Sequence, residues 1–337
     1  MYGYNENHKE FDEMLRFMRR INWTMVLVCG FVLAAMGGSF ALAAAAVPTE
    51  KAYMDEVYMN MADVKNLHYT VDLEADTPMG QMKMTGDGDL KTEPVVYQNN
   101  MNIWFRDEKG KEVTVPLKQY AEENAGNFTV YTLQKNEWVK QTVAVGQTFS
   151  KQLSSSDKSA LQKMMTGLMK DVKLQRETPT YKYMEVTLDS VRLSDILDAA
   201  IKENKEKTTA VPNSMMAQST AMARMLILSA GDITYVAKVD KKSKMITQVD
   251  MDMTGPIRKG ASLFLDIAQP REKDQVKDFL AKSTMTMSVV YSKCNQIDSI
   301  VIPQEIKDTA KEYKPMTRVK RKHEVKTPVV EDEPAAI

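Results

Sequence analysis

The chain has few of the residues on which most catalytic and metal sites are built. Its 337 residues include two cysteines and three histidines, at positions 8, 68 and 323. One cysteine, Cys29, lies in an apolar segment near the N-terminus, which leaves Cys294 as the sole thiol of the remaining chain. No disulfide can form within that part, so its fold must rest on a hydrophobic core. So few histidines also leave little room for a histidine-based metal site or a catalytic triad.

Net charge and the common catalytic motifs are lacking too. The chain has 45 basic and 45 acidic residues and a formal net charge of zero, so we expect no broad electrostatic attraction to nucleic acid or acidic lipid. The sequence contains no G-x-S-x-G, Walker A, Rossmann glycine or H-E-x-x-H pattern, and no nucleophile, base and orienting group stand together. We therefore predict a protein that is not an enzyme, uses no cofactor or metal, and has no nucleic-acid partner.

One long apolar run is present. Residues 23–47, WTMVLVCGFVLAAMGGSFALAAAAV, contain no charged residue and follow Arg19 and Arg20. An apolar run of about 20 residues can cross the ~30 Å hydrocarbon core of a bilayer as a helix. Because flanking arginines tend to stay in the cytoplasm, we predict that everything after Val47 is extracytoplasmic, in the periplasm or cell envelope.

Two interpretations of this run stay open. Several A-x-A sites in residues 41–46, followed by Pro48, fit a signal peptide that is cleaved on secretion. Residues 1–22 are long for a signal n-region, have a formal charge of zero and carry apolar residues at helical spacing, which favours a permanent transmembrane helix as anchor. Sequencing of the mature N-terminus distinguishes the two.

After the apolar run the hydrophobic period is first that of a helix and then that of strands. Thr49 is a candidate N-cap for a helix over residues 49–66. Alternation of period two begins at Leu67 and predicts a strand with one dry and one wet face. Further strands are predicted at 81–90, 95–105, 111–117, 128–133 and 137–143. No helical pattern separates these strands, so we expect an antiparallel meander.

The second half of the chain mixes helical and strand patterns. Helices are predicted over 155–172, 194–204 and 214–230, and a strand over 181–188. Two hairpins follow, 233–239 with 245–253 and 284–291 with 297–302, joined by a charged stretch at 270–282 that reads as a linker. Residues 311–337 carry basic clusters and an acidic end without apolar periodicity, which predicts a disordered tail.

Four segments carry a resemblance to a known group. They are MADVKNLHYTVDLEAD, KMTGDGDLKTEPVVYQNNMNI, YVAKVDKKSKMITQVDMDM and QIDSIVIPQEI. In their order and spacing they resemble the exported lipoprotein-carrier and lipoprotein-like superfamily, the LolA/LolB-like group. The resemblance implies an α+β fold in which a curved antiparallel sheet, an open half-barrel, is covered by helices around an apolar cavity for acyl chains. The chain departs from this group in having no lipobox, and in its middle helical insert and C-terminal tail.

Methionine is frequent, at 26 residues, and many methionines fall at the dry positions of the predicted elements. Such a face can repack around varied apolar ligands, because Met is flexible and polarizable; a methionine-rich core is the plainer explanation. Within the half-barrel that the resemblance implies, the dry positions of three strands are the candidate ligand-binding, cavity-lining residues. They are Leu67, Tyr69, Val71, Leu73, Val249, Met251, Met253, Met285, Met287 and Val289.

Acidic residues offer weaker candidates. Asp72 with Glu74, and Asp250 with Asp252, could bind calcium or act as acid and base, but the solvated face of a strand explains both pairs without any chemistry. Residues 86–89, GDGD, lack the downstream glutamate of a calcium loop. We expect a tight bend or bulge there.

These observations predict four parts. Residues 1–22 are a cytoplasmic n-region, 23–47 the anchor or signal segment, 48–310 an exported α+β half-barrel-like domain, and 311–337 the tail. The predicted role is non-enzymatic binding or carriage of an acyl chain, lipid or lipoprotein, with the membrane as a partner. Burial would drive it, at about 0.8 kcal/mol per methylene. The alternative is a structural or interaction protein of the bacterial cell envelope with no ligand cavity. Ligand identity, protein partner and oligomeric state stay open.

Overall fold

The computed structural model describes residues 49–78, 80–107, 110–124, 127–134, 136–144, 167–195, 227–259 and 270–312. The predicted n-region, the apolar run at 23–47 and residues 313–337 of the tail lie outside these ranges, as do most of the predicted middle helices. Within the described ranges, no helix is long and apolar enough to cross a membrane.

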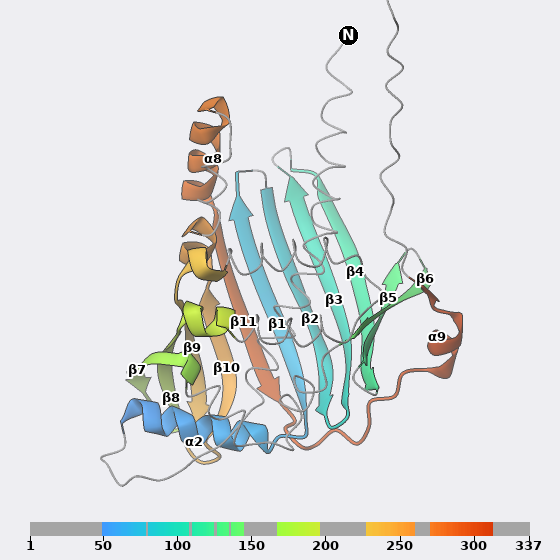
Figure 1. Cartoon of the computed structure of the whole chain (residues 1–337), viewed down its shortest axis with the longest axis horizontal. Coiled ribbons are helices and arrows are strands. Elements are labelled where there is room, and N and C mark those ends of the chain that lie inside the picture. Colours follow the sequence, from blue (N-terminus) through green and yellow to red (C-terminus); the bar gives the residue numbers. More distant parts are fainter. Residues whose placement is uncertain are drawn as a thin grey trace, which may run out of the picture.

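One twelve-stranded sheet makes up most of the described structure (Figure 1). In chain order its strands are β1 (Asn66–Thr77), β2 (Gly80–Thr92), β3 (Val95–Asp107), β4 (Glu112–Asn124), β5 (Asn127–Gln134), β6 (Glu137–Ala144), β7 (Met169–Glu177), β8 (Tyr181–Leu188), β9 (Ile233–Asp240), β10 (Met245–Asp252), β11 (Thr284–Ser292) and β12 (Lys311–Glu312). The spatial order is β12-β6-β5-β4-β3-β2-β1-β11-β10-β9-β8-β7. The pairs are antiparallel except for β12, which runs parallel to β6. The sheet is curved and unclosed, as predicted.

Helix α2 (Glu50–Ala62) packs across one end of the sheet (Figure 1). It begins as predicted, because the Thr49 hydroxyl accepts a hydrogen bond from the Ala52 N–H at 3.2 Å. Its apolar stripe is fully buried and joins the same core cluster as the dry positions of β1. The stripe consists of Met54, Val57, Tyr58 and Met61. We call the face of the sheet that contacts α2 the inner face.

Antiparallel register aligns the apolar positions of successive strands into rows on the inner face. Val71 of β1 lies opposite Val289 of β11, which lies opposite Val249 of β10. On its other side Val71 lies opposite Gly86 of β2, and Gly86 opposite Met101 of β3. Because side chains alternate across a strand, every second residue of each strand joins such a row, and the core becomes continuous from strand to strand.

Gly86 and Gly88 lie inside β2 and pair regularly with both neighbouring strands. The expected bend or bulge at residues 86–89 is therefore wrong. The glycines instead make room on the inner face. A Cβ on Gly88 would lie 2.5 Å from the Tyr69 hydroxyl oxygen and 2.5 Å from the Gln98 carbonyl oxygen. One on Gly86 would lie 2.3 Å from the Asn100 carbonyl oxygen and 2.8 Å from Cγ of Met101. Large side chains of the adjacent strands lean over both positions.

Two helix and linker predictions are wrong within the described ranges. Residues 169–172, expected to end a helix, belong to strand β7, which pairs with β8. The stretch 270–282 is not a linker but helix α8 (Pro270–Lys282), which contacts β1. Its many charges suit a helix with one packed side: Leu280 is buried, and Asp278 pairs with Lys282 one turn later at 2.7 Å.

The second predicted hairpin is also wrong, because residues 297–302 form no strand. Strand β11 already has β1 on one side and β10 on the other, so no edge is left for a following strand. The chain instead crosses to the far side of the sheet. There Ile302, and Ile306 of the following helix α9 (Gln304–Thr309), pack in a second cluster with Tyr120, Tyr131 and Ala310. Strand β12 then pairs with β6 at the edge.

We predict that Gly88→Ala lowers the free energy of unfolding by about 1–3 kcal/mol, because the added methyl group overpacks the Tyr69 ring. Chemical denaturation of the purified protein measures the change. Asp87→Ala, at the exposed neighbouring position on the outer face, is the control and should change stability by less than about 0.5 kcal/mol. Equal effects of the two substitutions would contradict the proposed packing.

Candidate ligand-binding face

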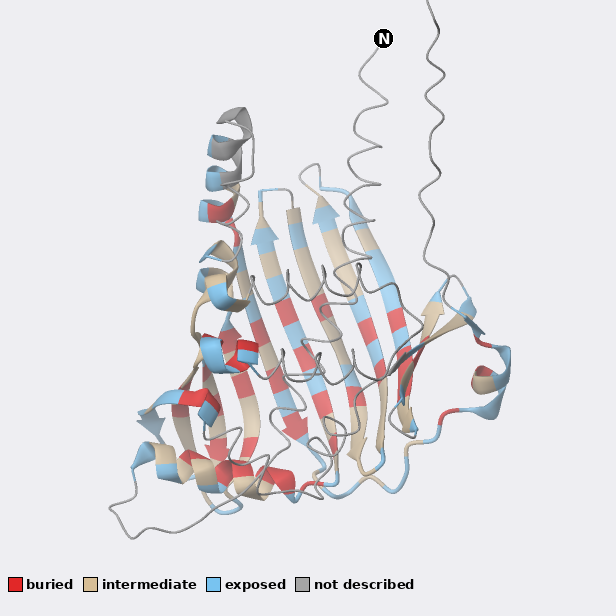
Figure 2. Ribbon diagram, in the orientation of Figure 1, coloured by how far each residue is buried: buried red, intermediate tan, exposed pale blue. Residues whose placement is uncertain are grey.

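The inner face changes in burial along the strands (Figure 2). At the end that α2 covers, Leu67, Tyr69 and Val71 of β1 are buried, and Val249 of β10 is fully buried. Buried residues thin out towards the other end of the strands (Figure 2). We call the two regions the filled half and the open half; the boundary runs through the row of Leu73, which is still buried.

The open half is apolar although it is partly exposed. In the row of Leu73, Ile103 is half-buried and Val115 is 49% exposed. In the next row, Met82 of β2 lies opposite Phe105 of β3, and both are half-buried. Met253 and Met285 continue this row on the β11 side, where the Met253 N–H donates to the Met285 carbonyl at 2.8 Å. We call this row, which lies at the end of the strands away from α2 and near α8, the mouth of the inner face.

All ten side chains proposed from the sequence lie on the inner face and belong to, or pack against, one cluster. The structure divides them by depth. Five lie in the filled half: Leu67, Tyr69, Val71, Val249 and Val289. Leu73, Met251 and Met287 share the boundary row, where all three are buried. Met253 and Met285 are half-buried at the mouth. Pairing through β2 and β3 adds Met82, Ile103 and Phe105, which lie at dry positions of the predicted strands 81–90 and 95–105.

The inner face also has a polar region that the apolar pattern did not reveal. Asn99 of β3 and Gln119 of β4 are buried opposite each other. Asn99 Nδ2 donates to Gln119 Oε1 at 3.3 Å, and Gln119 Nε2 donates to Thr132 Oγ1 of β5 at 3.1 Å. The sequence did contain a signal for this polar region: Tyr97, Asn99 and Met101 alternate along β3, so the amide of Asn99 falls on the same face as the apolar residues.

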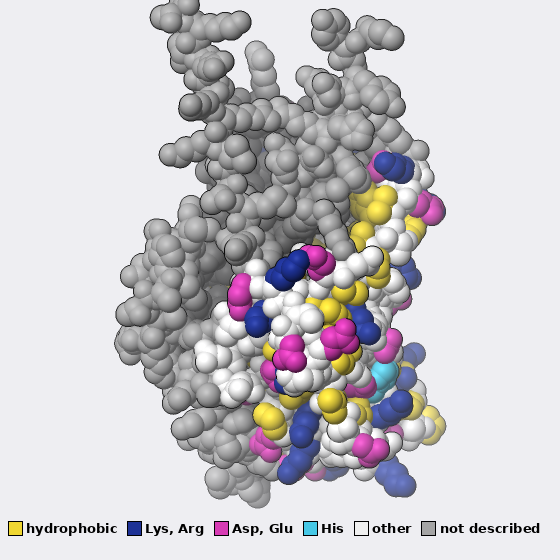
Figure 3. Space-filling model, turned by 90° about the vertical axis from the view of Figure 1, so that its right-hand side faces the viewer, with side chains coloured by type: hydrophobic (Ala, Val, Ile, Leu, Met, Phe, Trp, Pro, Cys, Tyr) yellow, Lys and Arg dark blue, Asp and Glu magenta, His cyan; other side chains and the backbone are white. Residues whose placement is uncertain are grey.

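The acidic pairs lie on the outer face and have structural partners. Lys83 contacts Glu74 at 2.5 Å and Asp72 at 3.4 Å. Asp250 accepts a hydrogen bond from the Ser288 hydroxyl at 2.7 Å, and Asp252 accepts one from the Thr254 N–H. Figure 3 shows acidic and basic side chains intermingled on the described surface. Within the described residues no group of three or more potential ligands could hold a metal ion.

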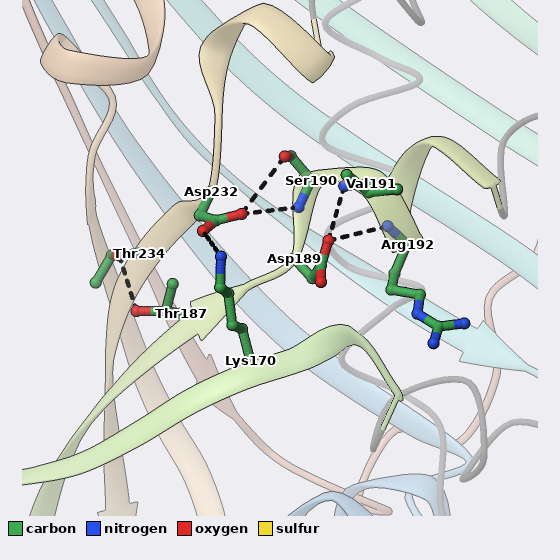
Figure 4. A network of polar contacts seen from close by, with 8 residues as sticks. All are labelled: Lys170, Thr187, Asp189, Ser190, Val191, Arg192, Asp232 and Thr234. Carbon is green, nitrogen blue, oxygen red and sulfur yellow. Dashed lines mark hydrogen bonds and ion pairs between the residues drawn. The ribbon is translucent and has the colours of Figure 1, made fainter.

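A network of hydrogen bonds ties strand β7 to the start of β9 (Figure 4). Asp232 contacts Lys170 at 2.6 Å and accepts a hydrogen bond from the Ser190 N–H at 3.2 Å. Asp189 caps the adjacent helical turn by accepting from the N–H groups of Val191 and Arg192. Lys170 and Ser190 hold the pKa of Asp232 below its ordinary value. Capping and strand attachment account for these groups.

The thiol of Cys294 lies beside the main core. Burial raises its pKa above the ordinary value, so it carries less thiolate at neutral pH than an exposed cysteine. It is half-buried against the main core.

Comparison with known proteins assigns the family. The model of DUF6612, a family of unknown function, matches residues 50–311. The chain belongs to the DUF6612 family. No curated protein matches the sequence. The DUF6612 match spans the whole described sheet, from α2 to the first residue of β12.

One solved structure similar to this DUF6612 protein is the lipoprotein LppX of Mycobacterium tuberculosis. The two share 7% sequence identity with a TM-score of 0.37, over 76% of this chain and 100% of that chain.

We predict that Asp232→Asn lowers the free energy of unfolding at pH 7 by about 1 kcal/mol, since it removes a charge-assisted hydrogen bond at a partly exposed site. The folded pKa of Asp232 is lowered, so its contribution is present above the unfolded pKa of about 3.9 and is lost as pH falls through the folded pKa. Denaturation between pH 7 and pH 3 should therefore show the two proteins converging in stability. Asp87→Asn is the control, and a pH-independent difference would contradict the assignment.

Proposed function

We propose that the protein binds a hydrophobic ligand, such as the acyl chain of a lipid or lipoprotein, on the open half of the inner face, without catalysis. The observation that carries the proposal is the contrast between the two halves of one continuous apolar face. The first half is buried where α2 packs against β7 and β10, and the second keeps large apolar side chains partly exposed on neighbouring strands.

The energetics favour such a ligand. Each methylene moved from water onto an apolar surface contributes about 0.8 kcal/mol, so a long acyl chain can bind with few polar contacts. The mouth row supplies three half-buried methionines, Met82, Met253 and Met285. Flexible thioether side chains adapt to chains of different length and branching, which suits a carrier better than a site for one rigid compound.

An extracytoplasmic location is part of the same proposal. The uncharged run at residues 23–47 directs the chain across a membrane. If that run stays as an anchor, only a few residues separate it from α2, which begins at Glu50. The binding face would then lie close to the bilayer that supplies its ligand, whereas a cleaved form would have to diffuse to it.

The alternative role, an interaction protein that pairs through a sheet edge, has less support. Edge strand β7 exposes most of its residues, yet these include Lys170, Asp171 and Lys173, and its pairing with β8 is interrupted by two irregularities. Charged side chains and bulges are features that keep an edge strand from pairing with another chain. The other edge is the two-residue strand β12.

We predict that the purified full chain carries extractable lipid. We also predict that Ile103→Asp reduces its affinity for an apolar probe by about tenfold or more, because a carboxylate beside an alkyl chain is left poorly solvated. Mass spectrometry of the organic extract and titration with N-phenyl-1-naphthylamine measure the two effects. Asn102→Asp adds the same charge at the next, exposed position on the outer face and should leave affinity unchanged. The proposal fails if wild type carries no lipid and binds no probe.

A further inference from the structure

Polar side chains gather on the inner face where the filled half reaches β3 to β6. The strand register places two rows of inner-face side chains in this region. One row runs from Tyr97 through Ala121 and Val130 to Gln141, and the other from Asn99 through Gln119 to Thr132. Both rows continue the apolar rows of Leu67 and Tyr69 across β2. The polar positions therefore lie on the surface that carries the core, at its β6 end.

Three oxygen atoms in these rows are buried and have no hydrogen-bond partner in the described structure. They are Tyr97 Oη, Asn99 Oδ1 and Gln141 Oε1, half of the six such side-chain atoms in the described part of the chain. Buried polar groups are nearly always paired, and an unpaired one costs its full desolvation. Three such atoms on one face leave hydrogen-bonding capacity there that the described residues do not use.

The orientation of Asn99 leaves an acceptor free. The side chain is 7% exposed, and its Nδ2 group is used by Gln119, whose own Nε2 group is used by Thr132. Both amide NH2 groups therefore donate towards β5, and the carbonyl oxygen Asn99 Oδ1 receives no hydrogen bond from the described residues. A ligand that pairs with it must offer an O–H or N–H donor.

Tyr97 supplies a neighbouring hydroxyl. Its ring reaches over β4 towards Phe128 of β5, with ring centroids 6.1 Å apart, and the small Ala121 on β4 leaves space beneath. Burial raises the pKa of Tyr97 above its ordinary value, so the phenol stays protonated at neutral pH and can donate as well as accept.

We infer that Tyr97, Asn99 and Gln141 form a polar subsite for the uncharged, hydroxyl- or amide-bearing head group of an amphiphile whose alkyl chain lies on the open half. The inference rests on the proposed function and names its ligand class. From β3 to β6 the two rows carry no charged side chain. The row of Asn99 then reaches Lys311 of β12, which contacts Glu137 at 2.8 Å, and Glu123, one row further, has an interaction of its own. On β3, Met101 and Ile103 link the subsite to the mouth, at about 7 Å for every two residues.

Two ligands with the same chain and the same ester group test the subsite. Monopalmitoylglycerol offers two hydroxyl donors, and methyl palmitate offers none. We expect the full chain to bind monopalmitoylglycerol about tenfold more tightly, measured by displacement of N-phenyl-1-naphthylamine, since a buried acceptor gains a donor only from the former. Equal affinities, with both ligands displacing the probe, would overturn the subsite and leave the proposed function standing. Failure of both ligands and the probe to bind would overturn both.

Variants separate the subsite from general packing. Tyr97→Phe removes an unpaired hydroxyl, so its melting temperature should equal or exceed that of wild type, while the preference for monopalmitoylglycerol falls to about twofold or less. Asn99→Leu should lose the same preference and keep its affinity for methyl palmitate. Tyr183→Phe removes a hydroxyl from the outer face, where the ring contacts Arg176, and should retain the full preference. Unchanged preference in both Tyr97→Phe and Asn99→Leu would contradict the inference.

Discussion

Packing of α2 against one end of the sheet is the interaction on which the rest of the structure depends. An open sheet of twelve strands exposes two faces, and the apolar one must be covered for the sheet to be stable in water. Four side chains of α2 are fully buried against it. Lys51 donates to the Met169 carbonyl of β7 at 2.8 Å, and Asn60 donates to the Lys244 carbonyl at 3.2 Å. The helix therefore also joins β7 and the β9–β10 turn, which are far apart in sequence.

Because α2 covers only one end, the same apolar face serves two purposes along its length. Residues such as Val249 and Val71 are buried and belong to the core. Ile103, Met82 and Val115 continue the pattern with partial exposure. A strand that alternates apolar and polar residues from end to end thus supplies both the folding core and the proposed binding surface.

The two edges and the outer face are adapted to solvent in different ways. The C-terminal segment packs Ile302 and Ile306 against Tyr120 and Tyr131 and adds β12 to the edge at β6. The edge at β7 relies on charged side chains. On the outer face, cross-strand pairs such as Lys83 with Glu74 offset acidic residues that could otherwise suggest a metal site.

The sequence by itself determined most of the strands and the start of α2, since alternation and helical spacing depend on neighbouring residues only. The ranges predicted around Leu67, for residues 181–188 and for the hairpin at 233–253 agree with β1, β8 and β9–β10, and the predicted N-cap Thr49 precedes α2. Long-range pairing decided the rest. Tyr69 lies opposite Tyr291, a contact between residues 222 positions apart that no local pattern encodes. That pairing excluded the second hairpin. The register of β1 with β2 and of β2 with β3 placed the glycines of β2 beside large neighbours and brought Tyr97 and Asn99 onto the face of the core. How deeply each side chain is buried separates the core from the candidate site, and it is set only when the strands assemble into the sheet.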